Sequence, residues 1–118
     1  MRFNPHYSAD DLRFVKHSMY LAKHHVELAM SYQKDGDYEV AANMMKNAVA
    51  KTAENHPESA NIPPRIHTRC HEVYGAARLL YIMLANEPKN VSQPILGVLH
   101  DKIFALHLDI ENEVAIYS

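Results

Sequence analysis

The chain has 118 residues, of which 47% are hydrophobic and 22% charged, and its formal net charge is −2 at neutral pH. This length and composition fit a single globular domain spanning residues 1–118 and exclude disorder as the default. A small negative net charge argues against a nucleic-acid binder, because such proteins usually carry a basic excess. The single cysteine, Cys70, excludes an intramolecular disulfide and fits a reducing compartment. With no apolar stretch of signal-peptide or membrane-spanning length, the sequence predicts a soluble cytoplasmic protein without membrane association.

The first predicted helix covers residues 8–34. Ser8 is a typical N-cap residue, and Asp10 and Asp11 follow it in the first turn, where negative charge opposes the helix dipole. Apolar residues then recur at spacings of three and four, the pattern of an amphipathic helix. They are Leu12, Val15, Met19, Ala22, Val26 and Ala29.

Three further helices are predicted, over residues 37–55, 64–86 and 92–117, separated by short segments that hold most of the prolines. Pro64 suits the first turn of a helix, where its missing N–H costs nothing. Each helix has its own apolar stripe. The stripes are Val40, Ala41, Met44, Met45, Ala48 and Val49; Ile66, Cys70, Val73, Ala77, Leu80 and Leu84; and Leu96, Leu99, Ile103, Leu106, Ile110, Val114 and Tyr117.

Four apolar stripes joined by short connections predict an all-α antiparallel four-helix bundle. The first and fourth helices, at about 26 residues each, should be roughly 39 Å long, and the second should be about a third shorter. This mismatch leaves part of a long helix uncovered within one chain. A second copy could cover it, so we expect a homodimer.

The densest polar cluster in the chain is residues 64–72. His67 and His71 lie four positions apart and could face one metal ion. No second ligand pair of this kind occurs, and the paired Glu-x-x-His motifs of di-iron bundles are absent. We therefore expect neither a metal site nor a cofactor.

Two features resemble the HEPN superfamily of small helical bundles. One is the hairpin from Leu28 through Asp35-Gly36-Asp37-Tyr38 to Ala42. The other is Arg65 followed by five residues and then His71, which is similar to the Arg-x4-6-His motif of that family's metal-independent ribonucleases. The resemblance implies a dimer whose subunits bring Arg65 and His71 to a shared cleft, with His71 as general acid or base and Arg65 stabilising phosphate charge on RNA. The motif departs from the family pattern at Ile66, where a polar residue is common.

The sequence leaves three functions open. The leading hypothesis is a non-catalytic helical protein-binding module (an adaptor, inhibitor or regulator) that works as a homodimer and contacts a protein partner through Tyr20, His24 and His25. The alternative is a HEPN-type ribonuclease using Arg65 and His71. The third is nucleic-acid binding without cleavage, resting on basic residues such as Lys16 and Lys23.

Overall fold

The computed structural model describes residues 7–53 and 61–117, and almost all of them are helical. Along the chain come α1 (Ala9–Lys34), α2 (Tyr38–Ala53), α3 (Pro64–Asn86), one turn of 3-10 helix η1 (Pro88–Asn90), and α4 (Gln93–Tyr117). No strand occurs among these residues, so the all-α prediction is confirmed. The helix bounds agree with the predicted ones to within two residues, except that positions 54 and 55 of the second predicted helix lie outside the described residues.

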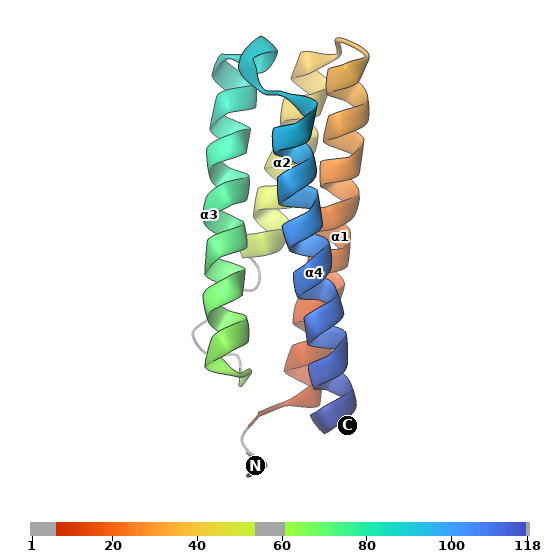
Figure 1. Cartoon of the computed structure of the whole chain (residues 1–118), viewed down its shortest axis with the longest axis vertical. Coiled ribbons are helices and arrows are strands. Elements are labelled where there is room, and N and C mark those ends of the chain that lie inside the picture. Colours follow the sequence, from red (N-terminus) through yellow and green to blue (C-terminus); the bar gives the residue numbers. More distant parts are fainter. Residues whose placement is uncertain (1–6, 54–60, 118) are drawn as a thin grey trace.

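The helices run alternately up and down and form an antiparallel four-helix bundle of 50 × 21 × 18 Å, as predicted (Figure 1). Each helix has two neighbours: α1 and α3 both pack against α2 and against α4. The helices contain 26, 16, 23 and 25 residues in chain order, so α2 is the short one, as the sequence indicates. None of the described helices has both the length and the apolar content that crossing a membrane requires.

One cluster of buried side chains runs through the bundle and takes residues from all four helices. Every residue of the predicted stripes of α1 and α3 is buried, and so are the first five of the seven predicted for α4. Val114 and Tyr117 pack half-buried at the edge of the core. The α2 stripe is narrower than predicted, because Val40 is 38% exposed and only Ala41, Met45 and Ala48 are buried fully. Val40 precedes Ala41 by about 100° of helix rotation, which turns it away from the core.

The turn between α1 and α2 depends on Gly36. Its φ of +84° lies in the left-handed region that side chains with a Cβ rarely adopt. The turn is closed by backbone hydrogen bonds from Gly36 N to Gln33 O (3.1 Å) and from Asp37 N to Tyr32 O (2.9 Å). These bonds satisfy carbonyls at the end of α1 that have no partner within the helix.

Side-chain amides close the same end of the bundle. Gln33 at the end of α1 donates to the carbonyl of Val91, and Gln93 at the start of α4 donates to Gln33 and to the Met30 carbonyl (3.0 Å). Val91 itself is buried. The chain entering α4 is therefore fixed to the end of α1 by polar bonds as well as by apolar contact.

At the opposite end, the segment that leads into α3 is fixed to the start of α1. Ser8 N donates to Asn61 O (2.7 Å), and Asn61 N donates to Asp11 Oδ2 (2.9 Å). Ser8 also caps α1 as predicted, since its hydroxyl accepts a hydrogen bond from Asp11 N at 3.2 Å. Ile62, next in the chain, is buried and joins the core.

Two glycine-to-alanine substitutions should change stability in opposite directions. Gly36→Ala should lower the free energy of unfolding by about 1 kcal/mol, because alanine is strained at positive φ. Gly75→Ala should raise it by roughly 0.5–1 kcal/mol, because Gly75 lies inside α3 and nothing lies within 4 Å of the added Cβ. Urea unfolding of both variants measures the two changes. Unchanged stability in Gly36→Ala would contradict this account of the α1–α2 turn, and a loss of stability in Gly75→Ala would contradict the prediction for α3.

Candidate functional site

The three side chains predicted to bind a partner lie within two turns of α1 and differ in exposure. Tyr20 is 50% exposed and lies on the side of α1 that meets α4, where its ring is 5.9 Å from that of His107. His24 is exposed, whereas His25 is partly buried and lies near enough to Lys51 of α2 to be affected by its charge. The next side chain on the α4 side is Lys23, whose Nζ is 5.3 Å from the centre of the Tyr20 ring.

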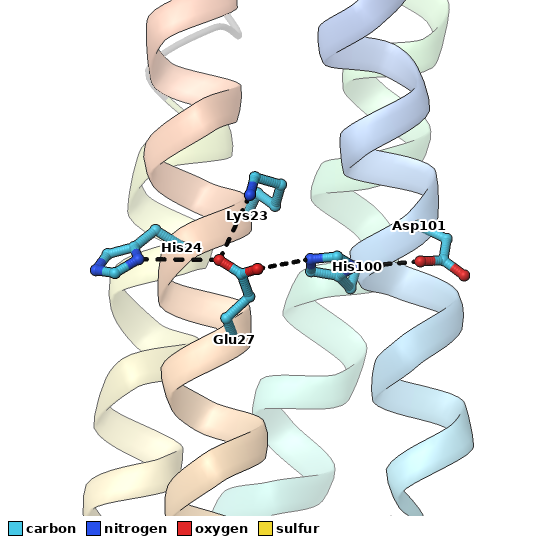
Figure 2. Close-up of polar contacts among 5 residues, drawn as sticks. All are labelled: Lys23, His24, Glu27, His100 and Asp101. Atoms are coloured by element: carbon cyan, nitrogen blue, oxygen red, sulfur yellow. Dashed lines mark hydrogen bonds and ion pairs between the residues drawn. The ribbon is translucent and has the colours of Figure 1, made fainter.

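Glu27 of α1 is the centre of a polar network that joins α1 to α4 (Figure 2). Its carboxylate lies 3.5 Å from Lys23 Nζ and 3.9 Å from His24 Nδ1 on the same helix. Across the interface it meets His100 Nε2 at 3.1 Å, and His100 Nδ1 meets Asp101 Oδ1 at 3.2 Å. Both ring nitrogens of His100 therefore face carboxylate oxygens, and only the protonated imidazole can donate to both. We interpret this network as a structural link between the two longest helices.

His25 has an unfavourable setting for a positive charge. Burial lowers its pKa from the usual 6.5, and the nearby His24 and Lys51 lower it further. Its Nδ1 is buried and has no hydrogen-bond partner among the described residues. The side chain is therefore better suited to the neutral form than to a charged contact with a partner.

The pKa of His25 makes stability depend on pH. The unfolded chain takes up a proton at this site at higher pH than the folded chain does, so stability should fall as the pH drops below 6.5 toward the lowered pKa. In His25→Gln, the difference in unfolding free energy between about pH 7.5 and about pH 5 should be smaller than in the wild type. Denaturant titrations at the two pH values test this, with His17→Gln as the control, since His17 is exposed on the same helix and is not among the residues that shift the pKa of His25. An unchanged pH dependence in His25→Gln would contradict the assignment.

The ribonuclease hypothesis depends on Arg65 and His71, and the structure places them on different sides of α3. The Arg65 guanidinium faces α4, where it is 2.6 Å from Glu113 Oε1 and 3.7 Å from Asp109 Oδ2. Arg69, one turn on, also pairs with Asp109. His71 is exposed and lies six residues after Arg65, which is about 120° around the helix. Within one chain, Arg65 binds carboxylates and does not meet His71.

Metal-binding side chains are not gathered in the part of the chain that the structure describes. No group of three or more His, Cys, Asp or Glu side chains there is placed to hold a metal ion.

Cys70 is buried in the core stripe of α3, with 1% of its surface exposed. Burial raises the pKa of its thiol from 9.0 to about 12, although the nearby Arg69 opposes the shift. At neutral pH this leaves about a thousandfold less thiolate than an ordinary cysteine has. Because the thiolate is the nucleophile, this position does not suit covalent catalysis.

Cys70 should therefore react with a thiol reagent only when the protein unfolds. Folded protein at neutral pH should label at least about a hundredfold more slowly than protein in urea, because both burial and the raised pKa suppress reaction. Absorbance after addition of a chromogenic disulfide reagent gives both rates. Rapid, complete labelling without denaturant would show that Cys70 is accessible and would contradict the packing of α3.

An apolar hollow lies between α3 and α4, and we call it the α3–α4 groove. Its volume is about 280 Å³, and its lining residues are Ala76, Leu79, Leu80, Ile95, Val98, Leu99 and Lys102. Three of these residues are large, apolar and exposed: Leu79 (59%), Val98 (56%) and Ile95 (43%). Its lining residues come from the second half of α3 and the first half of α4, the parts of these helices nearer the top of Figure 1.

The two halves of the α3–α4 seam differ in chemistry. Near the start of α3, ion pairs from Arg65 and Arg69 to Asp109 and Glu113 bridge the helices. Near the end of α3, no ion pair between described residues bridges α3 and α4, and the apolar α3–α4 groove opens to solvent there. Sequence reasoning missed this groove, although Leu79 and Val98 stand outside the predicted stripes of their helices and so are apolar residues without a place in the core.

A scan against protein-family models, a search of curated proteins and a search of solved structures each found no match to this chain.

Proposed function

We propose that the chain is a non-catalytic helical protein-binding module, an adaptor, inhibitor or regulator, and that it works as a homodimer. The observation that supports this proposal is the α3–α4 groove. Isolated apolar residues are normal on protein surfaces, but a contiguous set around a hollow is typical of an interaction site. Leu79, Ile95 and Val98 are such a set.

The chemistry of the groove favours a second copy as its occupant. A twofold dimer places the same patch on both subunits, so a charged patch would meet its own charge. The α3–α4 groove carries one charged residue, Lys102, at its lining. Pairing two grooves would bury Leu79 and Val98 of both subunits and leave each Lys102 free to reach solvent along its flexible stem.

The groove lies at the end of the bundle where α2 begins, so a subunit docked there would add apolar burial without covering the stretch that the short α2 leaves open (Figure 1). α2 has 16 residues against 26 in α1, so the bundle is unequally covered along its length. A partner subunit along α3 and α4 would add apolar burial on the side where those helices meet solvent. Burial of each such side chain stabilises an association by about 1.5–3 kcal/mol at most, before the entropy of association is subtracted.

A charge placed in the groove should separate the dimer. Val98→Glu and Leu79→Glu should shift the protein from dimer to monomer at micromolar concentration, because two carboxylates would be buried opposite each other. Leu108→Glu is the matched control: Leu108 is also on α4 and 42% exposed, but it does not line the groove. Light scattering on the eluting protein gives the mass of each variant.

Two results would reject the proposal. A wild-type protein that is monomeric at micromolar concentration would remove the dimer. Cleavage of RNA without metal, lost in both Arg65→Ala and His71→Ala, would establish the HEPN-type ribonuclease in place of a non-catalytic module.

A further inference from the structure

A second hollow lies on the outer surface between α2 and α3, and we call it the α2–α3 hollow. Its volume is about 410 Å³. Its lining residues are Lys46, Val49 and Ala50 of α2 and Tyr74, Arg78, Tyr81 and Ile82 of α3. Ile82 is 44% exposed, so the hollow combines an apolar surface with two tyrosine rings.

The hollow continues along the bundle. A neighbouring hollow of about 360 Å³ also has Tyr81 in its lining and extends to Tyr38 and Glu39 at the start of α2. Together they follow α2 from Tyr38 to Ala50, which is about 18 Å at 1.5 Å per residue. A helix of about 12 residues has this length.

Positive charge borders the apolar part of this surface. Lys46 on α2 and Arg78 on α3 are both exposed, and neither makes an ion pair or hydrogen bond with another residue that the structure describes. The described parts of α2 and α3 hold only two acidic residues, Glu39 and Glu72. Glu39 is at the far end of the surface, and Glu72 is six residues before Arg78, about 120° around the helix.

From this charge and shape we infer that the α2–α3 hollow binds an acidic amphipathic helix of a partner protein. The partner helix lies between α2 and α3 with apolar side chains at spacings of three and four against Val49, Tyr81 and Ile82. Its carboxylates, near one end, pair with Lys46 and Arg78. Helices bind apolar grooves in this way, and tyrosine and arginine are the residues that contribute most at such interfaces.

The inference deepens the proposed function and rests on it, since it names the partner's chemistry and the face that the partner uses. The two surfaces are on different sides of α3, one toward α4 and one toward α2. The module therefore has one face for a second copy and another for the partner. The cationic face does not suit a twofold dimer, because like charges would meet.

Three helical peptides of roughly 16 residues test the inference, since shorter helices are marginal in water. All three carry the same leucine face, flanked near one end by two glutamates, two glutamines or two lysines. Fluorescence anisotropy should show saturable binding of the glutamate peptide and binding at least about tenfold weaker for the other two.

The protein variants reverse the charge of the hollow. Lys46→Glu/Arg78→Glu should lose binding of the glutamate peptide and gain binding of the lysine peptide, because like charges repel and opposite charges attract. Arg13→Glu/Lys34→Glu is the matched control, with the same change in net charge at two exposed positions of α1, and it should bind as the wild type does. Circular dichroism confirms that both double variants are folded.

Three outcomes would overturn the inference. One is equal binding of the glutamate and glutamine peptides, and another is unchanged glutamate-peptide binding in folded Lys46→Glu/Arg78→Glu. The third is a change in self-association of Lys46→Glu/Arg78→Glu without peptide binding, which would assign the hollow to a second copy.

In that case the acidic face of α4, where Phe104 and Leu108 are exposed between Asp101 and Glu111, would be the occupant. If the protein is a monomer that binds the glutamate peptide, only the proposed dimer is rejected. If it is a dimer that does not bind the glutamate peptide, only the inference about the α2–α3 hollow is rejected.

Discussion

The bundle depends on burying apolar side chains that recur every three or four residues on all four helices. No single helix can bury its own stripe, and the hydrophobic contribution of about 25 cal/mol per Å² of apolar area is realised only when the helices pack together. The stripes differ in bulk. α1 and α2 contribute alanines such as Ala22, Ala29 and Ala48, whereas α4 contributes only leucine and isoleucine to the fully buried set. Small residues let α1 and α2 approach closely, and the large residues of α4 fill the interior.

Local patterns were sufficient to predict the helices, their order and most of the core. The spacing of apolar residues identified the stripes. Capping and turn residues such as Ser8, Gly36 and Pro64 identified the helix ends, because each affects the backbone only within a few residues of its own position. Val40 shows the limit of that method. It fits the α2 stripe by type and spacing, but its burial depends on where the neighbouring helices lie.

Contacts between distant parts of the chain could not be predicted. The pairs Arg65–Glu113 and Glu27–His100 join residues that are 48 and 73 positions apart. Such pairs depend on which helices are neighbours and on how far each helix is shifted along the bundle axis relative to the next. The spacing of apolar residues within one helix determines neither of these. The candidate surfaces were missed for the same reason. Residues such as Leu79, Val98 and Arg78 become a surface only once α2, α3 and α4 are placed side by side.

Because the large apolar residues of the α3–α4 groove are exposed, substitutions there have little effect on the stability of the fold. Leu79 and Val98 are each more than half exposed, so changing them removes little burial from the isolated subunit. Core positions such as Leu96 and Ile103 have no such freedom, because a buried truncation costs roughly 2–5 kcal/mol out of a total of only about 5–15. Substitutions at the exposed groove positions can therefore accumulate over evolutionary time while the buried scaffold stays the same.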